Sequence, residues 1–214
     1  MSLTIAIFGA SGATGLLLTE RCLAAGHTVK VLARNPATFC FADRVQIIQG
    51  DAKDPQAVRQ TIAGCDVVLS ALGARSLKKE DVLEVAVPLI VAAMKDLSIR
   101  RIIALGSAGA LPTSLDKQPA WRRWIVQNIV YNTVLKWPVT SQIAQYAALS
   151  TSNLDWTMVM PAMLTNTPAR GIYRIDPEAL PRNGSRISRA DVADFMMQQI
   201  DNPQWVRNGV YITW

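Results

Sequence analysis

The sequence offers little for metal-binding or disulfide chemistry, because its 214 residues include one histidine and three cysteines. His27, Cys22, Cys40 and Cys65 are scattered along the chain, and no Cys-x-x-Cys motif occurs. These residues cannot supply an ordinary Cys/His zinc site, so we expect no metal. The odd cysteine count and the lack of a recognisable signal peptide lead us to expect a reducing compartment, the cytoplasm.

Long hydrophobic runs are also lacking. The longest apolar stretches are shorter than the roughly 20 residues that a membrane span needs, so we expect no membrane partner. Half of the residues are nevertheless apolar and 18% are charged, which suits one folded core and gives no reason to expect disorder. We expect a single domain over residues 1–214, with a cofactor-binding core over 1–160 and a substrate-side extension over 161–214.

Acidic residues are in the minority. The chain has 22 lysines and arginines against 16 aspartates and glutamates, a formal charge of +6. This excess suits an anionic ligand. The basic residues are dispersed, since the only adjacent pairs are at 78–79, 100–101 and 122–123, and we therefore expect no nucleic-acid partner.

What the sequence does contain is a regular alternation of short apolar runs and helical segments. The apolar runs predict strands at residues 3–8, 28–33, 45–48, 66–71, 101–105, 156–160 and 210–213. The spacing between them predicts helices at residues 12–25, 55–62, 80–97 and 190–201. Strands that alternate with helices in this way form βαβ units. The sequence therefore predicts an α/β, Rossmann-type, doubly wound and mainly parallel sheet.

Residues 112–153 do not follow this alternation and hold half of the six tryptophans, namely Trp121, Trp124 and Trp137. Trp121 and Trp124 share helical spacing with Ile125 and Ile129. One interpretation is a helix that faces the core. The other is a substrate cover or a subunit contact, so a monomer and a homodimer both stay open.

A glycine-rich loop follows the first predicted strand and opens the first predicted helix. Its sequence is Gly9-Ala10-Ser11-Gly12-Ala13-Thr14-Gly15. In this position Gly9 would allow a tight turn, Gly12 would let the backbone approach a pyrophosphate, and Gly15 would let the helix pack closely on the strand. The free N–H groups at the start of the helix would then face the anion.

The end of the second predicted strand indicates which dinucleotide is bound. A site that prefers NAD usually has an acidic residue here to bind the ribose 2′-hydroxyl. This chain has Arg34, whose guanidinium suits a 2′-phosphate. We therefore expect NADP(H), although a surface arginine that opens a loop is the alternative interpretation.

Ligands of open α/β sheets bind outside the carboxyl ends of the strands. At those ends the sequence places further candidate cofactor contacts, namely Asp51, Ala52, Leu72, Gly73, Ala74, Arg75 and Pro161. Arg75 is either a second anion contact or a surface charge. Ser107, which follows the fifth predicted strand, either hydrogen-bonds a nicotinamide or substrate carbonyl or caps a local turn.

A family resemblance rests on the order of six segments, at residues 5–15, 31–36, 50–51, 72–75, 90–95 and 154–161. Together they resemble the atypical short-chain dehydrogenases, in the NmrA-like branch that includes biliverdin-IXβ reductase, also called flavin reductase. The resemblance implies a Rossmann fold, NADP(H) binding and hydride transfer to a flavin or a linear tetrapyrrole. It also implies that Ser107 matches an active-site serine and that Pro161 begins the segment beside the nicotinamide.

The sequence departs from this family at catalytic positions. The Tyr-x-x-x-Lys motif is absent, because Tyr131 precedes Lys136 by five residues. Gln142 and Tyr146 stand where many relatives have Lys and Glu, and Met163 stands where the reductase has a histidine. Tyr146 is the best remaining candidate for an acid, with core packing as the alternative.

The sequence thus predicts an NADPH-dependent reductase of a planar acceptor such as a flavin, a quinone or a linear tetrapyrrole. The alternative is an NADP-binding redox sensor with little turnover. Other candidates have simpler interpretations. His27 lies at a predicted turn far from the ligand edge, and Asp191 and Asp194 are expected on a solvated helix face. Met158 and Met160 are expected in the core, with Met163 near the substrate.

Overall fold

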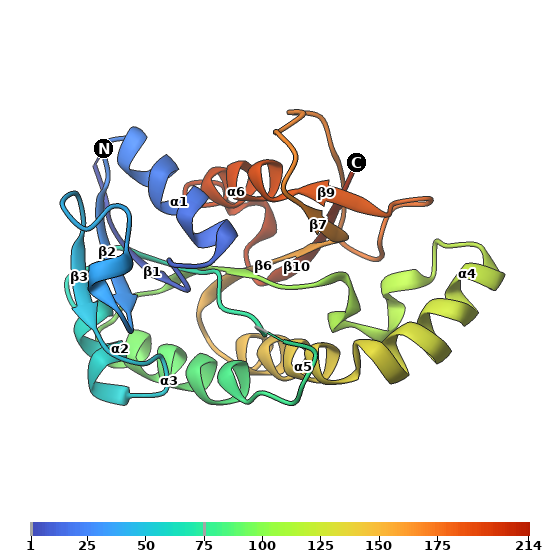
Figure 1. Ribbon diagram of the computed structural model, residues 1–214, viewed down its shortest axis with the longest axis horizontal. Coiled ribbons are helices and arrows are strands. Elements are labelled where there is room, and N and C mark those ends of the chain that lie inside the picture. The colour runs from blue at the N-terminus through green and yellow to red at the C-terminus, as the bar shows by residue number, and fades with distance from the viewer. Residues whose placement is uncertain (1, 75) are drawn as a thin grey trace.

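The computed structural model describes residues 2–74 and 76–214. Its centre is an eight-stranded sheet with the order β3-β2-β1-β4-β5-β6-β10-β8 (Figure 1). The neighbouring strands pair in parallel except β8, which runs antiparallel to β10. The strands are β1 (Thr4–Phe8), β2 (Thr28–Ala33), β3 (Gln46–Gln49), β4 (Val67–Ser70), β5 (Arg101–Leu105), β6 (Asp155–Pro161), β8 (Arg174–Asp176) and β10 (Asn208–Thr213). A separate pair joins β7 (Met163–Thr165) to β9 (Arg186–Ser188).

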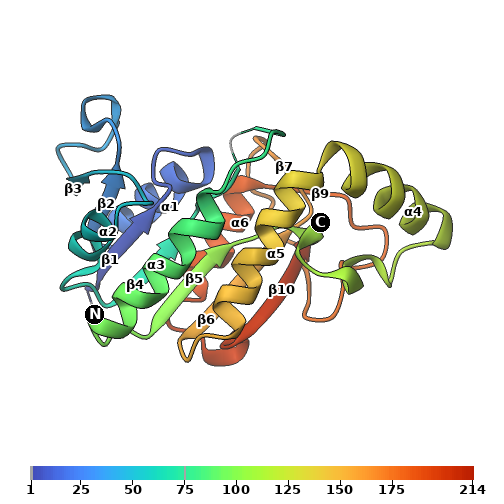
Figure 2. The same ribbon diagram turned by 90° about the horizontal axis from the view of Figure 1, so that it is seen from below.

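Helices cover both faces of the sheet (Figures 1 and 2). One face carries α1 (Ala13–Ala24) and α6 (Arg189–Gln198), and the other carries α2 (Pro55–Ile62), α3 (Val82–Asp96) and α5 (Lys136–Ser150). Each face has its own apolar core. Leu18 and Phe195 lie in the first core, and Ile90 and Met158 lie in the second. The strands must therefore be apolar on both sides, which is why they appear as continuous hydrophobic runs.

The predicted α/β Rossmann-type fold is confirmed. The bounds of β2, α2 and β5 agree with the sequence prediction, and the other predicted elements are shifted by one to three residues. Local signals explain this agreement: the Asp54 side chain caps α2 by accepting from the Gln56 N–H at 2.9 Å, and Pro55 opens the helix. The sequence analysis missed β7, β8 and β9, which have three residues each and no clear alternation.

Residues 161–214 return to the main sheet. They contribute β10, which pairs with β6 from Asn208 to Ile212, and they contribute α6, which packs beside α1. His27 lies at the turn before β2, and its Nδ1 accepts from the Leu3 N–H at 3.2 Å. Met158 and Met160 are fully buried, as expected.

Residues 120–134 form an arm that projects beyond the end of the sheet (Figures 1 and 2). The arm consists of α4 (Ala120–Ile125) and a π-helical segment (Val126–Val134), and α5 continues from it. Trp121 is 67% exposed and Trp124 is 61% exposed, and Ile125 and Ile129 are exposed beside them. These four residues are called the tryptophan face below. The prediction of a core-facing helix is wrong here, since none of the described side chains of the arm is buried.

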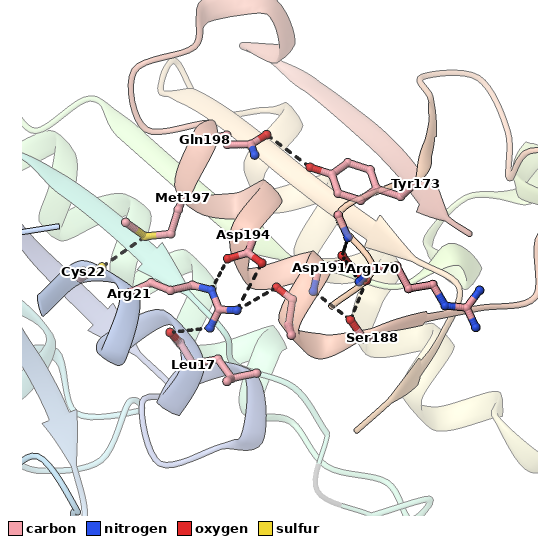
Figure 3. A network of polar contacts seen from close by, with 12 residues as sticks. Leu17, Arg21, Cys22, Arg170, Tyr173, Ser188, Asp191, Asp194, Met197 and Gln198 are labelled. Carbon is pink, nitrogen blue, oxygen red and sulfur yellow. Dashed lines mark hydrogen bonds and ion pairs between the residues drawn. The ribbon is translucent and has the colours of Figure 1, made fainter. Parts of the chain in front are cut away.

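Asp191 is the centre of a buried polar network at the start of α6 (Figure 3). Its carboxylate accepts hydrogen bonds from the Ser188 hydroxyl at 2.7 Å, from the N–H groups of Arg170 and Gly171, and from Trp214 Nε1 at 2.8 Å. The expectation of a solvated face is therefore wrong for Asp191, which is fully buried. Asp194, one turn later, is partly exposed and forms an ion pair with Arg21 of α1.

This network sets the ionisation of Asp191. Burial by itself would raise the pKa of the carboxyl group, but the donors from Arg170, Ser188, Gly171 and Trp214 outweigh it and hold the pKa below the ordinary range. The ionised carboxylate therefore ties the 170–171 loop and the C-terminal tryptophan to the first turn of α6. That turn includes Arg189, which borders the cleft described below.

We predict that Asp191→Asn lowers the free energy of unfolding at neutral pH by about 2–3 kcal/mol, because its amide group cannot accept from all these donors. The melting temperature should fall by roughly 5–10 °C. Asp194→Asn is the matched control on the same helix and should cost at most about 1 kcal/mol, as for a partly exposed ion pair.

The pH dependence of the Asp191→Asn effect has a defined sign. Because the folded pKa is lowered, the stabilisation is present above the unfolded carboxyl pKa of about 3.9 and is lost as the pH falls through the folded value. The stability difference between the wild type and Asp191→Asn should shrink there. Chemical denaturation at a series of pH values measures this, and a difference that grows on acidification contradicts it.

Candidate active site

A cleft of about 630 Å³ lies at the carboxyl ends of β1, β2, β4 and β5. This is the edge where the order of the strands reverses between β1 and β4, the usual ligand position in open α/β sheets. The described residues that line it include Gly9, Ala10, Ser11, Gly12, Ala13, Thr14, Arg34, Asp51, Ala52, Leu72, Gly73, Ala74, Ser76, Leu77, Val82, Ser107, Leu135, Pro138, Gln142, Leu164 and Arg189.

The glycine loop turns the chain from β1 into α1. Gly9 has φ +75°, and a Cβ there would lie 2.6 Å from the backbone of Ala71. A Cβ on Gly15 would overlap the Gly9 carbonyl oxygen, so Gly15 lets α1 pack against the turn. Gly12 has neither restriction to the same degree: its nearest neighbour would be the Gly9 oxygen at 3.3 Å. Gly9 and Gly15 are therefore required by the backbone conformation of the turn. Gly12, which has no side chain, leaves room in the cleft for a ligand.

The amino end of α1 faces the cleft without a side-chain cap. Gly12 is the N-cap residue and makes no side-chain hydrogen bond to the first turn, while its carbonyl accepts from the Leu16 N–H at 2.8 Å. The first N–H groups of a helix have no partner within the helix, and the helix dipole adds partial positive charge. Ala13 and Thr14 thus present donors suited to a diphosphate.

Arg34 lies at the mouth of the cleft after β2. Its side chain is exposed, and within residues 2–74 and 76–214 no carboxylate forms an ion pair with it. Asp51 is beside it at the end of β3 and accepts from the Lys53 N–H at 2.9 Å, which orders that turn. The structure therefore brings Arg34, Asp51 and Ala52 together with the glycine loop.

The loop after β4 forms the facing wall. A Cβ added to Gly73 would meet no atom within 4 Å, so internal packing does not require a glycine at this position. Leu72 and Ala74 line the cleft next to it. Because Gly12 and Gly73 have no side chains, a bound dinucleotide could approach the protein backbone closely at both positions. The predicted contact Arg75 lies outside the described residues.

Ser107 caps a local turn and also lines the cleft. Its Oγ accepts from the Gly109 N–H at 3.2 Å, at the start of the short 3₁₀ helix Ala108–Ala110. Ser107 therefore caps a local turn, as its alternative interpretation states. The cap does not prevent Ser107 from binding a ligand, since its hydroxyl hydrogen stays available as a donor.

Another part of the cleft wall comes from Leu135 and helix α5. The sequence analysis noted Gln142 as a departure from the family but did not include it among the site residues. Leu135, Pro138 and Gln142 line the cleft there. Gln145 Nε2 donates to the Leu105 carbonyl at 2.9 Å and to Gln142 Oε1 at 3.3 Å. Gln142 Oε1 therefore already accepts a hydrogen bond, and the N–H₂ group of the Gln142 amide is left to donate to a ligand. The i, i+3 spacing of two glutamines on a helix beside the cleft is the signal that could have identified them.

The structure does not bring every predicted residue to the cleft. Tyr146 lies one turn beyond Gln142 and packs edge-to-face on Trp156, with ring centres 5.6 Å apart. This agrees with the alternative interpretation, in which Tyr146 packs in the core. Pro161 ends β6 in register with Ile212 and lies outside the cleft lining, where Leu164 contributes instead. Met163 is exposed and does not line the cleft.

Arg189 is a cation that the sequence analysis missed. It lies at the first turn of α6, lines the cleft, and donates to Asn166 Oδ1 at 2.6 Å. It comes from a distant part of the chain, so only the packing of α6 beside α1 brings it near the amino end of α1. It is therefore a second positive group on the glycine-loop side of the cleft.

Residues 9–203 match the family of NAD(P)H-binding proteins. The chain belongs to that family. A crystal structure of a putative exported protein from Burkholderia pseudomallei is 26% identical, covers 99% of this chain and 100% of its own, and has a TM-score of 0.80. The matched span begins at Gly9, so it takes in the whole glycine loop and every cleft residue described above.

Two other solved structures share the fold over nearly the whole chain. One is a short-chain dehydrogenase/reductase from Veillonella parvula in complex with NADP, with 22% identity, coverage of 100% and 95%, and a TM-score of 0.81. The other is the anaerobillin reductase ChuY from Escherichia coli O157:H7, with 21% identity, coverage of 98% and 96%, and a TM-score of 0.82. A 2-alkyl-3-oxoalkanoate reductase from Shewanella oneidensis is 37% identical over 62 residues, which is 29% of this chain and only 16% of that protein.

Two features are absent from the described residues. None of their helices combines the length and the apolar character needed to cross a bilayer. No group of three or more histidine, cysteine or acidic side chains is placed so that it could hold a metal ion.

Proposed function

We propose that this protein is an NADPH-dependent oxidoreductase that transfers hydride to a planar acceptor such as a flavin, a quinone or a linear tetrapyrrole. The observation that carries the proposal is the division of the cleft into two chemically different halves. One half has the glycine loop, the uncapped start of α1, Arg34 and Arg189. Among the described residues, the other half has mainly apolar walls, with the hydroxyls of Ser76 and Ser107 and the amide of Gln142.

The first half suits the anionic groups of NADP. The N–H groups of Ala13 and Thr14 would hold the diphosphate, with Arg189 as a further positive group. Arg34 would bind the 2′-phosphate, because an exposed guanidinium without a carboxylate partner loses no ion pair on binding it. The NADP complex of the Veillonella parvula relative supports the same choice of cofactor.

The second half suits an acceptor that needs no protein acid. Leu77, Val82, Leu105, Leu135 and Pro138 provide apolar surface that would exclude water from the reacting groups. Reduced nicotinamide supplies a hydride when bound. Ser107 Oγ and the Gln142 amide would donate hydrogen bonds to carbonyl oxygens there. None of the described residues of this half titrates near neutral pH, which favours acceptors that take their proton from water.

Arg34→Glu tests the cofactor choice. The substitution should weaken NADP binding by about 100-fold, through the lost charge-assisted hydrogen bonds and added repulsion, and should weaken NAD binding much less. Arg44→Glu, another exposed arginine that does not line the cleft, is the matched control and should leave both affinities unchanged. Calorimetric titration measures both, and equal losses for NADP and NAD would show that Arg34 does not contact the 2′-phosphate.

The reaction itself is tested by NADPH oxidation, followed by nicotinamide absorbance, with FMN, water-soluble quinones and biliverdin as acceptors. We expect turnover above the rate without enzyme for at least one of them. Tight NADPH binding with no turnover across the panel would contradict the proposal. It would favour a redox sensor, which needs no proton donor beside the acceptor.

Gln142→Leu tests the acceptor half. Removing one donor should lower kcat/KM for the best acceptor by about tenfold, while the affinity for NADPH stays unchanged. Gln127→Leu, on the exposed arm, is the control and should have wild-type kinetics. A loss of NADPH affinity that accounts for the whole effect would place Gln142 with the cofactor instead.

A further inference from the structure

The tryptophan face, formed by Trp121, Trp124, Ile125 and Ile129, has no role in the cleft. Other side chains hold the arm to the body. Arg122 donates to the Gly184 carbonyl at 2.8 Å and to Gln118 Oε1 at 3.0 Å, and the Tyr131 ring lies over Gly109. The four apolar side chains are exposed. The arm itself extends past the sheet (Figures 1 and 2).

Exposing this apolar face to water is energetically unfavourable. Single exposed apolar side chains are ordinary, but neighbouring tryptophans and isoleucines on one helical face mark an interaction site. The positions i, i+3, i+4 and i+8 make the face continuous along the arm. The face extends toward the cleft through Val134 and Trp137, which are also exposed.

The sequence around this face is basic, but only part of that charge is free, because Lys117 and Arg123 have carboxylate partners. From Lys117 to Leu154 the sequence has no aspartate or glutamate and four basic residues, Lys117, Arg122, Arg123 and Lys136. Lys117 pairs with Asp176 at 2.6 Å, and Arg123 pairs with Asp116 at 3.5 Å. Among the described residues, no carboxylate forms an ion pair with Arg122 or Lys136.

This charge argues against a second copy of the chain as the partner. A two-fold interface brings the same patch of both copies together, so Arg122 and Lys136, which lack an ion-pair partner among the described residues, would approach a second basic arm. The arm provides no carboxylates to compensate them. An anionic surface has the complementary charge instead. Helical segments with tryptophan on one face and Arg or Lys beside it bind in the interfacial layer of anionic bilayers.

We propose that the tryptophan face docks on the surface of an anionic lipid bilayer. The protein would lie on the membrane without crossing it. The expectation of no membrane partner came from the lack of a spanning segment, and a surface contact needs none. Trp and Ile side chains would enter the headgroup layer, and Lys136 would stay at the level of the lipid phosphates.

The arm continues into residues 135–138 at the edge of the cleft, called the lip below. This position limits the class of acceptor that we propose. Leu135 and Pro138 line the cleft on either side of Lys136 and Trp137, and the Lys79 ammonium lies 5.4 Å from the Trp137 ring centre. Leu77, which is exposed, lines the same region. Docking would bring this lip near the lipid. Resting on the proposed function, the inference favours a lipophilic quinone among the possible acceptors.

Flotation of the full chain with lipid vesicles tests the docking. Vesicles of equal parts phosphatidylglycerol and phosphatidylcholine should bind the protein, and the binding should weaken as salt is added. Vesicles of phosphatidylcholine alone should bind little. The double variant Trp121→Ser/Trp124→Ser should bind the anionic vesicles at least about tenfold more weakly. Both tryptophans are exposed, so the variant should keep the wild-type melting temperature.

Two controls isolate the cause. Ile172→Ser removes a side chain that is 82% exposed but lies outside the arm, and it should bind as the wild type does. Lys136→Glu should weaken binding to anionic vesicles, while Lys95→Glu, an exposed lysine near the end of α3, should do so much less.

Three results would overturn the docking proposal. They are no binding of the wild type to anionic vesicles, equal binding by the double tryptophan variant, and a concentration-dependent dimer in sedimentation analysis that this variant abolishes. The last result would identify a second copy as the partner. Turnover of a water-soluble quinone without vesicles separates the two proposals, because it tests the reductase and does not depend on the arm.

Discussion

The close contact between Gly15 at the start of α1 and the Gly9 carbonyl determines the geometry of the cleft. Without a Cβ at Gly15, the helix can rest directly on the turn that leaves β1. The positive φ of Gly9 makes that turn tight enough to pass under the backbone of Ala71. Together they aim the uncapped end of α1 at the carboxyl edge of the sheet. The half of the cleft that we propose for the dinucleotide phosphates is thus shaped by backbone, and Arg34 and Arg189 add positive charge to it.

The acceptor half is built differently. Its apolar wall depends on helix α5 packing against α3, and its polar groups are held by neighbours that do not reach the ligand. Gln145 holds the Gln142 oxygen, and the Ser107 oxygen caps a turn. Fixed donors in an apolar wall would orient the planar acceptor that we propose, without supplying a proton. This arrangement agrees with membership in an NAD(P)H-binding family and leaves the identity of the acceptor to the shape and surroundings of the cleft.

Polar groups far from the cleft act on it through the fold. The Asp191 carboxylate joins the loop at 170–171, the C-terminal tryptophan and the first turn of α6, where Arg189 begins. At the other end of the molecule, Arg122 joins the arm to the loop at Gly184. The Asp191 carboxylate is buried. The Arg122 contact leaves the tryptophan face exposed, and this face is the surface that we propose for docking.

The sequence by itself determined the order of strands and helices, the glycine loop and the position of Arg34. These features depend on local rules: apolar runs buried on both faces, glycines required by a turn, and proline or glycine at helix ends. Only the tertiary structure decided which side chains meet. Gln142 and Arg189 reach the cleft because helices α5 and α6 pack beside it, and Leu164 reaches it from the short strand β7. The local sequence does not determine that packing. Tyr146 and Asp191 show the same limit, since whether a polar residue on a helix faces ligand, solvent or core depends on what packs against it.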